Sequence, residues 1–599
     1  MDKKYILGIN LPLKSRCHES GVALIDFDGN VLFAASEERF SRKKLEGDFP
    51  ELSIKAMFAH TEIKKEDVVF VVVPTLSFYR KAFRFMKFVI RERWRHLFRL
   101  KTYQTLWKIF FKEKDFQAAA GSNQEVEGSG LKYYWKDFIK NNFPKAELKF
   151  SDHHIAHASG AYFCSPWERS LVLTLDGAGN LLSSVVGLAD RGRIRIIGRS
   201  FVPNSLGSFW GSITKACGFK SGIRHGGKVT GLAARGNPDK LIDKMREAVK
   251  CKGLGIKIKE ELFFNPDKLL PDWAGYEPER IKGFLGEASR EDIAAAAQQR
   301  LIEVVLGIVK NAQKKVEFDK VVMAGGVFAN VLMNQAILEL PGVKDVFIFP
   351  AMSDGGLAFG AAIHFLSELK LREGERLKPR ELRNVYFGPS HDEKEILQAL
   401  QEQKINYKKL ENPAKDIAKL IYANKIVAFY QGRVEFGPRA LGNRSIIYAP
   451  IDPTANDWLN KKLRRSEFMP FAPVTMLEHI KDCYLDIADD PLAARFMTIT
   501  YACTDKMRKE APACVHVDGT ARPQVITRED NPYYYDIVNE YYKLSGIPTL
   551  INTSFNMHEE PIVESPFDAV RSFLDSGIDY LVMENYIAAF EDNKHLAKN

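Results

Sequence analysis

Two histidines spaced for one metal ion mark the most informative stretch of the chain. In "SDHHIAHASGAY", His153 and His157 lie four positions apart after Ser151 and Asp152, either of which can cap a helix. On a helix this spacing places both imidazoles on one face, one turn apart, so that both can reach one ion, while His154 points elsewhere. Spacing alone leaves a second interpretation open, in which these histidines are ordinary core or surface residues.

Two carboxylates could complete such a site. Asp176 ends the strand-like "LVLTLD", and Asp354 lies in "PAMSDGGLAFG", in a loop between a predicted strand and a predicted helix. Two imidazoles with two carboxylates suit Fe(II), Mn(II) or Zn(II) and leave positions open for substrate. His18, beside Glu19 in the loop before a strand, is a candidate general base, because the ordinary pKa of histidine lies near neutrality. A surface role for His18 is the alternative.

Basic residues gather in glycine- and proline-bounded loops of the second half of the chain. Arginines in rigid loops suit bidentate binding of phosphate or carboxylate, although charged loops are often only solvated. "NTSFN" follows the strand-like "IPTLI", at a place where α/β proteins tend to bind ligands. The candidates are Arg439 and Arg444 in "FGPRALGNRS", Arg465 in "KKLRRSEFMPFAP", Arg522 in "HVDGTARPQ", and Ser554 and Asn556.

The elements that must position these residues follow a repeated order. "KYILGIN" and "SLVLTLD" each begin a pattern of strand, turn and strand, and residues 320–340 and 346–366 each predict a strand, a Gly-Gly turn and a helix. Glycine turns before helices let backbone N–H groups approach phosphates, as actin-like nucleotide sites require. The candidate nucleotide-binding residues are Gly177, Gly325, Gly326, Asn330 and Gly355. A shift to charged residues, Gly and Pro predicts a domain boundary near Leu382.

Residues 78–135 form a basic and aromatic segment. Basic residues at 80, 84, 87, 91, 95 and 99 recur every three or four positions, and Phe83, Met86, Ile90, Trp94 and Leu97 follow a neighbouring face. This pattern predicts an amphipathic helix. Such a helix could lie on an anionic membrane, hold an anionic or lipid-linked substrate, bind RNA phosphates, or simply cover its own domain.

Composition indicates a soluble protein of two or three domains. The 599 residues are 45% hydrophobic and 27% charged, with a formal net charge of +10. The N-terminus lacks a long apolar stretch, which predicts no export. Seven cysteines without a CxxC pair favour a reduced cytoplasmic compartment and no structural zinc.

Nine ordered blocks spanning nearly the whole chain resemble the O-carbamoyltransferase family, which includes the nodulation-factor, cephamycin and tobramycin carbamoyltransferases. The blocks are "HHIAHASGAY", "LTLDGAGN", "GGKVTGLAARG", "GGVFANVLMN", "PAMSDGGLAFGAA", "FGPRALGNRS", "MPFAP", "HVDGTARPQ" and "NTSFNMHEEPIVESPFDA". The resemblance implies an α/β fold, with an actin-like ATPase domain at 1–382, into which residues 78–135 are inserted, and a YrdC-like domain at 383–599.

The resemblance also implies an activity. The C-terminal domain would make carbamoyl-adenylate from carbamoyl phosphate and ATP, releasing pyrophosphate and phosphate, and the N-terminal domain would transfer the carbamoyl group to an acceptor hydroxyl. His153, His157, Asp176 and Asp354 match the family's metal ligands, with Fe(II) as the expected ion, and His18 and Lys228 fall at catalytic positions. Arg439, Arg444, Arg465 and Arg522 fall in the family motifs that bind carbamoyl phosphate and the ATP phosphates, with Ser554 and Asn556 nearby.

Two departures leave the acceptor open. The usual "HDAS" is "HESG" here, and the common "EGK" is "GGK" at Gly226–Lys228. Together with the basic insertion, these departures allow an anionic or lipid-linked glycan or a natural product as acceptor. We also expect a cytoplasmic protein that can contact the inner face of the membrane and can form a homodimer. No nucleic acid partner is expected. The alternatives are a tRNA threonylcarbamoyl-modifying enzyme and a non-catalytic glycan-binding or membrane-binding protein.

Overall fold

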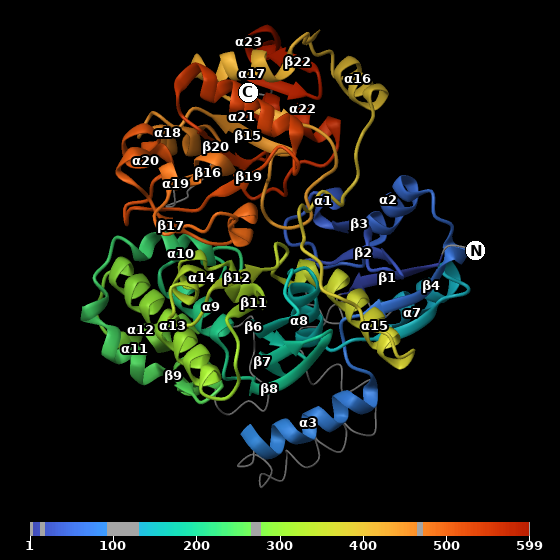
Figure 1. Ribbon diagram of the computed structural model, residues 1–599, viewed down its shortest axis with the longest axis vertical. Coiled ribbons are helices and arrows are strands. Elements are labelled where there is room, and N and C mark those ends of the chain that lie inside the picture. Colours follow the sequence, from blue (N-terminus) through green and yellow to red (C-terminus); the bar gives the residue numbers. More distant parts are fainter. Residues whose placement is uncertain (1–3, 12–17, 93–130, 265–276, 464–470, 598–599) are drawn as a thin grey trace. The chain divides into compact units, whose positions relative to one another are not determined.

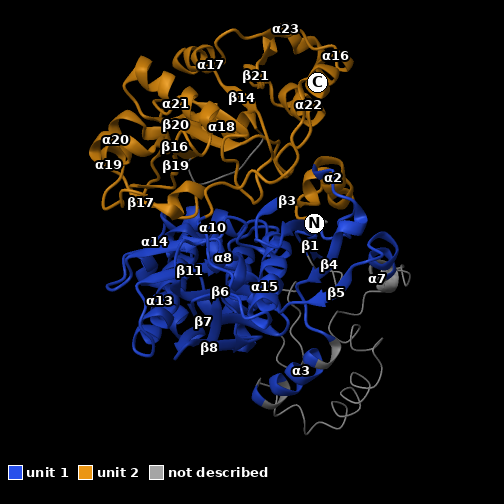
Figure 2. Ribbon diagram, turned by 45° about the vertical axis from the view of Figure 1, so that its right-hand side comes forward, with its two compact units in different colours: residues 1–32, 47–51, 61–381 blue, residues 33–46, 52–60, 382–599 orange. Residues whose placement is uncertain are grey.

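The computed structural model describes residues 4–11, 18–92, 131–264, 277–463 and 471–597. The chain divides into two compact units (Figure 2). Unit 1 comprises residues 1–32, 47–51 and 61–381, and unit 2 comprises residues 33–46, 52–60 and 382–599. The division after residue 381 lies next to the predicted boundary near Leu382. Two segments assigned from the sequence to the first domain, 33–46 and 52–60, cluster with unit 2 instead.

Residues 33–46 cluster with unit 2 partly because Arg39 and Arg42 make hydrogen bonds within that unit. The Arg39 guanidinium donates to the carbonyl of Gly437 at 2.7 Å. Arg42 donates to the carbonyls of Pro561 and Ile562, both at 2.8 Å. Such contacts between residues more than 390 positions apart leave no local signal in the sequence.

The described residues between Tyr5 and Ile348 contain two five-stranded sheets whose strands follow the same internal order. One runs β3-β2-β1-β4-β5 and the other β8-β7-β6-β11-β12. In each, β1 or β6 pairs antiparallel with the next strand of a hairpin and parallel with a later strand. The bounds are β1 Tyr5–Asn10, β2 Gly21–Asp26, β3 Val31–Ser36, β4 Val68–Val73, β5 Glu147–Phe150, β6 Arg169–Gly179, β7 Leu182–Asp190, β8 Arg193–Phe201, β11 Lys320–Ala324 and β12 Asp345–Ile348, with a separate pair β9 Val249–Lys252 and β10 Gly255–Ile258.

This duplicated order agrees with the expected actin-like architecture, and the α/β class is confirmed. The predicted hairpin after β2 is present, where the Asp26 carboxylate accepts hydrogen bonds from the backbone N–H groups of Asp28 and Asn30. Gly29 has φ +84°, a conformation that favours glycine.

A helix follows the last strand of each sheet. α8 (His153–Phe163) follows β5, and α15 (Leu357–Arg372) follows β12 (Figure 1). The two helices pack on each other at glycines, since Gly360 lies against the Ala156 backbone. Small residues therefore allow the close approach that brings the two helix starts together.

Unit 2 is built on an eight-stranded mixed sheet in the order β13-β22-β21-β14-β15-β20-β16-β19. α17 (Pro413–Tyr422) and α21 (Pro532–Ser545) pack against its apolar core, which includes Phe429, Val474 and Leu550. The strands are β13 Lys408–Lys409, β14 Val427–Tyr430, β15 Arg444–Tyr448, β16 Ala472–Met476, β19 Gln524–Ile526, β20 Thr549–Ser554, β21 Tyr580–Met583 and β22 Tyr586–Ala589, with a separate pair β17 Tyr501–Ala502 and β18 Thr520–Ala521.

The remaining helices connect and cover these sheets. They are α1 Glu38–Ser41, α2 Glu51–Thr61, α3 Phe78–Glu92, α7 Leu131–Asn142, α9 Leu206–Ala216, α10 Gly226–Ala233, α11 Ile242–Ala248, α12 Pro278–Leu285, α13 Arg290–Gln313, α14 Val331–Leu338, α16 Glu393–Glu402, α18 Ala455–Lys462, α19 Ile480–Cys483, α20 Asp505–Glu510, α22 Pro566–Ser576 and α23 Phe590–Asn593. Among the described residues, no helix is both long and apolar enough to span a membrane.

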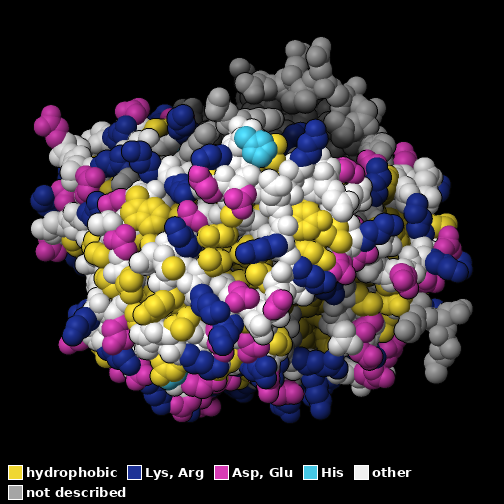
Figure 3. Space-filling view, turned by 90° about the horizontal axis from the view of Figure 1, so that it is seen from above, with side chains coloured by type: hydrophobic (Ala, Val, Ile, Leu, Met, Phe, Trp, Pro, Cys, Tyr) yellow, Lys and Arg dark blue, Asp and Glu magenta, His cyan; other side chains and the backbone are white. Residues whose placement is uncertain are grey.

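The predicted amphipathic helix is present as α3, but its packed face differs from the predicted one. Phe85 and Phe88 are buried against apolar residues of β7 and β8, including Phe201. Phe83 and Met86, expected on the apolar face, are 61% and 49% exposed. The predicted positions beyond Glu92 lie outside the described residues until Leu131. On the face of the molecule drawn in Figure 3, basic and acidic side chains are interspersed.

Candidate functional site

The structure brings the four predicted metal ligands of unit 1 together. One ligand atom from each of His153, His157, Asp176 and Asp354 lies within 4.8 Å of the others. From Nε2 of His153, Asp176 Oδ2 is at 3.1 Å and Asp354 Oδ1 at 3.6 Å. From Nε2 of His157, the same two oxygens are at 3.3 and 3.6 Å. Metal binding by these residues remains a prediction.

Chain segments from both halves of unit 1 position this cluster. His153 and His157 occupy the first two turns of α8, which the Asp152 side chain caps by accepting from the backbone N–H groups of His154 and Ile155. Asp176 lies on β6, and Asp354 begins the short 3-10 turn that leads into α15. The helical spacing therefore sets the histidine pair, and the packing of α8 against α15 sets its distance from Asp354.

The electrostatics of the cluster suit a cation. Burial alone would lower the pKa of His157, but Asp176 and Asp354 outweigh it and raise the pKa to about 9. Burial likewise opposes ionisation of Asp176, yet His153 and His157 hold its pKa well below the usual range. His157 Nε2 and Asp354 Oδ1 are buried and make no hydrogen bond to any described residue. This donor set, with two ligand atoms lacking hydrogen-bond partners, fits a divalent transition metal.

His154 points away from the cluster, as the helical spacing predicts. Its Nδ1 lies 2.8 Å from the hydroxyl of Thr174 on β6. Full burial, and then the nearby His153, lowers the pKa of His154 to about 3. The His154 ring is therefore neutral at physiological pH, and we assign it a supporting role in the site rather than a role as a ligand.

His18 lies close enough to the cluster to respond to its charge. Its Nδ1 is 3.6 Å from the Glu19 carboxylate. Burial favours the neutral ring, but Glu19, Asp354 and Asp176 outweigh it and raise the pKa of His18 to about 10. Glu19 also accepts from the N–H of Gly355. The acidic residue in the "HESG" variant therefore ties the His18 loop to the loop of Asp354.

Two supporting residues were missed by the sequence reasoning. The Asn10 amide at the end of β1 donates to the carbonyls of Glu19 and Asp354, both at 2.9 Å. The Arg84 guanidinium of α3 pairs with the Asp152 carboxylate that caps α8. An asparagine ending a buried strand offered a weak signal for the first, and nothing in the sequence linked Arg84 to Asp152.

Four predicted nucleotide-binding residues, Gly325, Gly326, Asn330 and Gly355, lie in the expected turns of unit 1, whereas Gly177 lies within β6 near its end. The N–H of Gly177 donates to the Asp176 carboxylate at 2.7 Å. Gly325 has φ +105°, and a Cβ there would lie 2.2 Å from the Leu175 carbonyl oxygen, so only glycine fits. Gly326 begins the next turn, and Gly355 donates to Glu19.

Asn330 and Lys228 sit in more enclosed surroundings. The Asn330 side chain caps α14 and exchanges hydrogen bonds with the Gln298 amide at 2.7 and 3.0 Å. Lys228 is buried on α10. Their predicted contacts with nucleotide and substrate remain predictions.

The candidate residues of unit 2 meet at one edge of its sheet. β15 begins where β20 ends, since Ser445 pairs with Ser554. β16 begins beside the same end of β20, and β19 runs parallel to β16. The loops before β15 and β19, the loop after β20 and the start of β16 therefore converge. We call this the arginine edge, defined by Arg439, Arg444, Arg522, Ser554 and Asn556; Arg465 lies outside the described residues.

Arg444 and Asn556 use their side chains to hold these loops. Arg444 is fully buried, stacks at 3.5 Å on the ring of Tyr430, and donates to several backbone carbonyls, including those of Gln431 and Gly432. Asn556 donates to the carbonyls of Met557 and Glu560. By contrast, Arg439 and Arg522 are half-buried.

Glu435 is a further residue that the sequence reasoning missed. One carboxylate oxygen accepts from the backbone N–H groups of Leu441, Asn443 and Arg444, at 2.8 to 3.1 Å. Three converging N–H groups fix the shape of the "GPRALGN" loop. An acidic residue two positions before a Gly-rich basic loop gave only a weak signal of this role.

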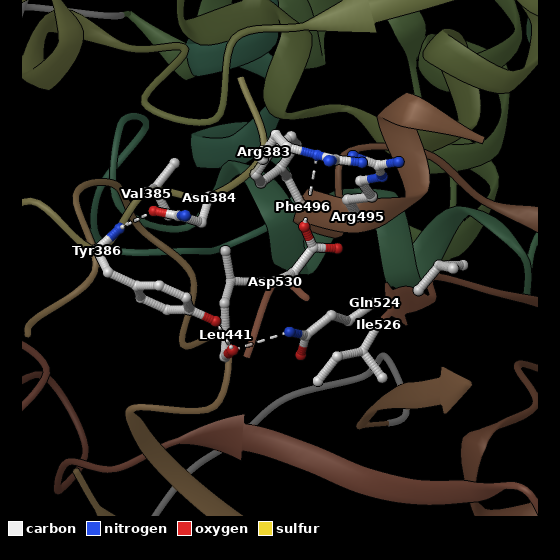
Figure 4. Close-up of a pocket in the computed structure, with 11 residues that line it drawn as sticks. Arg383, Asn384, Val385, Tyr386, Leu441, Arg495, Phe496, Gln524, Ile526 and Asp530 are labelled. Carbon is white, nitrogen blue, oxygen red and sulfur yellow. Dashed lines mark hydrogen bonds and ion pairs between the residues drawn. The ribbon is translucent and has the colours of Figure 1, made fainter. Parts of the chain in front are cut away.

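A pocket in unit 2 lies beside the arginine edge rather than on it. Figure 4 shows the Tyr386 hydroxyl and the Gln524 amide both directed at the Leu441 carbonyl, each at 2.8 Å. Arg383 pairs with Glu529, and Asp530 lines the same pocket. None of the predicted site residues lines this pocket, so it is not the predicted phosphate site.

Known proteins similar to this chain cover nearly all of it. The family model described as Carbamoyltransferase N-terminus matches residues 6–363, and Carbamoyltransferase C-terminus matches residues 418–589. The protein MJ1051 of Methanocaldococcus jannaschii is 31% identical over 95% of this chain and 98% of its own length. Nodulation protein NolNO of Sinorhizobium fredii is 28% identical over 96% of this chain and 80% of its own.

A solved structure, component A of (R)-2-hydroxyglutaryl-CoA dehydratase from Acidaminococcus fermentans, is 16% identical and covers 60% of this chain and 97% of its own, with a TM-score of 0.33. The two family models lie in the expected order along the chain, and they favour carbamoyl transfer over the tRNA-modifying alternative. The chain therefore belongs to the carbamoyltransferase family and is an enzyme of that class.

Proposed function

We propose that the protein is an ATP-dependent O-carbamoyltransferase. Unit 2, as a YrdC-like domain, forms carbamoyl-adenylate from carbamoyl phosphate and ATP, and unit 1 transfers the carbamoyl group to an acceptor hydroxyl. The observation that carries the proposal is the His/Asp cluster of unit 1 inside the region matched by the N-terminal family model. The arginine edge, within the region matched by the C-terminal model, supports the adenylation half.

His153, His157, Asp176 and Asp354 would hold the metal, for which Fe(II) is our first candidate. A metal there would stabilise negative charge that develops on a carbonyl or phosphate oxygen. The chain's own residues supply the proton chemistry. Neighbouring carboxylates, Glu19 foremost, raise the pKa of His18 to about 10 and so favour its protonated form at neutral pH. A cation held by Asp176 and Asp354 would offset their share of this negative charge and lower the pKa of His18, so that the ring could accept a proton from an acceptor hydroxyl.

Two variants separate the half-reactions. Arg439→Met should abolish pyrophosphate release from carbamoyl phosphate and ATP, because it removes a guanidinium at the arginine edge. His153→Ala should keep pyrophosphate release and lose transfer of labelled carbamoyl group to a hydroxyl acceptor, screened over glycans and natural products by mass detection. Pyrophosphate release that persists in Arg439→Met would contradict this assignment of the adenylation site.

The acceptor is proposed to include an anionic or lipid-linked glycan, reached at a membrane surface through α3. The supporting observation is that Phe83 and Met86 are exposed, with Lys87 placed over the Phe83 ring at 4.4 Å. Vesicles containing anionic lipid should bind the wild-type protein. A triple variant, Phe83→Ser, Met86→Ser and Lys87→Glu, should bind them at least about tenfold more weakly. Equal sedimentation of both proteins with vesicles would remove the membrane proposal.

A further inference from the structure

The products of the proposed adenylation reaction require a water molecule. Carbamoyl phosphate and ATP give carbamoyl-adenylate, pyrophosphate and phosphate only if one water is consumed. The atoms balance when water first splits carbamoyl phosphate into carbamate and phosphate, after which a carbamate oxygen attacks the α-phosphorus of ATP and displaces pyrophosphate. Unit 2 therefore needs a group that takes a proton from water, and arginines cannot serve because they stay protonated.

His516 has the geometry of a general base. It is 6% exposed, and its Nδ1 lies 3.0 Å from Oδ2 of Asp518. Its Nε2 is buried and makes no hydrogen bond within the part of the chain that the structure describes. A carboxylate on one ring nitrogen fixes the tautomer in which the other nitrogen carries the lone pair. The imidazole is thus oriented, with one basic nitrogen unused.

The turn around His516 holds this orientation rigidly. Asp518 Oδ1 accepts from the N–H and the hydroxyl of Thr520, at 2.9 and 2.7 Å. The N–H of His516 donates to the Thr520 carbonyl at 2.8 Å, and Gly519 donates back to His516 at the same distance. Burial raises the pKa of the Asp518 carboxyl, but its hydrogen bonds with His516 and Thr520 outweigh burial and lower it. The Asp518 carboxylate therefore stays ionised and keeps its hydrogen bond with the His516 ring.

The same turn leads along the chain into the arginine edge. It runs through β18 directly to Arg522, which precedes β19. The Asn456 amide donates to the carbonyl of Ala513, three residues before His516, at 2.8 Å, and accepts from the N–H of Phe471 at 2.9 Å. Phe471 directly precedes β16, whose first residue pairs with Asn552 of β20. One side chain thus ties the His516 turn to the start of a strand at the arginine edge.

We propose that His516, oriented by Asp518, is the general base that activates this water. Nε2 takes a proton, the water oxygen bonds to phosphorus, the bond between phosphorus and the carbamoyl oxygen breaks, and carbamate leaves with the electron pair. This inference rests on the proposed function, because it assigns a catalytic residue to the carbamoyl phosphate step. A purely structural His–Asp pair that stabilises the turn is the competing explanation.

The test compares two substrates in the full-length protein. With carbamoyl phosphate and ATP, His516→Gln should reduce phosphate release at least about 100-fold, the lower range for loss of a general base. With ammonium carbamate and ATP, which bypass hydrolysis, its pyrophosphate release should stay within about twofold of wild type. Asp518→Asn should show the same pattern with a smaller loss. His479→Gln is the matched control, because His479 lies 3.2 Å from Asp482 but is far more exposed.

Each other outcome is decisive. His516→Gln with wild-type phosphate release overturns the proposal. Loss of both reactions in His516→Gln shows a structural role and also overturns it. If the wild-type protein releases pyrophosphate from neither substrate pair, the proposed function itself fails, and this inference falls with it.

Discussion

Replacing Gly360 by alanine should force apart the two helices that bring the candidate metal ligands together. A Cβ at this position of α15 would lie 2.1 Å from the carbonyl oxygen of Ala156 on α8, whereas Cβ contacts under 3.0 Å are essentially never seen. The obstructing atom is backbone and cannot rotate away. The helices must therefore separate by roughly 1 Å in a close-packed interior.

The cluster cannot absorb that displacement. His157 belongs to α8, and Asp354 lies just before α15, so the separation acts directly on their 3.6 Å distance. Metal–ligand distances tolerate only about ±0.2 Å. We expect the affinity of Gly360→Ala for a divalent ion to fall at least about 100-fold, the larger end of the effect of disturbed ligand support. Overpacking should also lower the free energy of unfolding by about 1–3 kcal/mol.

Gly160→Ala is the matched control within the same helix pair. There an added Cβ would meet its nearest atoms, in the Phe349 ring, at 3.6 Å, an ordinary contact. Calorimetric titration with Co(II) or Zn(II) measures the affinities, and urea unfolding measures the stabilities. The reasoning fails if Gly360→Ala binds metal as tightly as wild type, or if Gly160→Ala loses affinity equally.

Three further predictions concern charged side chains that stabilise the two units. Arg84→Ala should lower the free energy of unfolding by about 1–3 kcal/mol, measured in urea, because Asp152 loses a charged hydrogen-bond partner. Arg444→Met should destabilise unit 2 by more than about 3 kcal/mol in urea unfolding, because several buried carbonyls lose their donor. Burial alone would lower the pKa of His391, but its hydrogen bond with Glu564 outweighs burial and raises the pKa above 6.5. The stability lost in His391→Gln should therefore be full below pH 6.5 and should shrink as the pH rises through the raised pKa, as urea unfolding between pH 5.5 and 9 would show.

The grouping of the four candidate metal ligands could be predicted because each of them lies beside a local signal. An aspartate cap and the four-residue spacing place the two histidines on one helix face, and the strand end and the Gly-Gly turn place Asp176 and Asp354. The resemblance then supplied the grouping that spacing could not. The role of Arg444 could not be predicted from local sequence signals of this kind. A basic residue in a Gly-rich loop looks the same in sequence whether it faces a phosphate or several backbone carbonyls.

The packed face of α3 was mispredicted for a related reason. Aromatic residues occur around much of this helix, so periodicity supports more than one apolar face. The choice depends on the surface that the helix meets, and here Phe85 and Phe88 contact apolar residues that β7 and β8 present. Long-range packing of this kind, like the association of residues 33–46 with unit 2, is fixed by partners far away in the chain.

The duplicated architecture explains why the cluster needs so much negative charge. α8 and α15 each follow the last strand of one sheet, and both begin at the cluster. The N-terminal end of a helix carries partial positive charge, so two such ends together disfavour a cation. Asp176 and Asp354 offset this, whereas Asp152 caps the N-terminus of α8 and is paired with Arg84. The same two helix ends favour an anion, so the arrangement suits a metal ion bound together with a phosphate-bearing substrate better than it suits either alone.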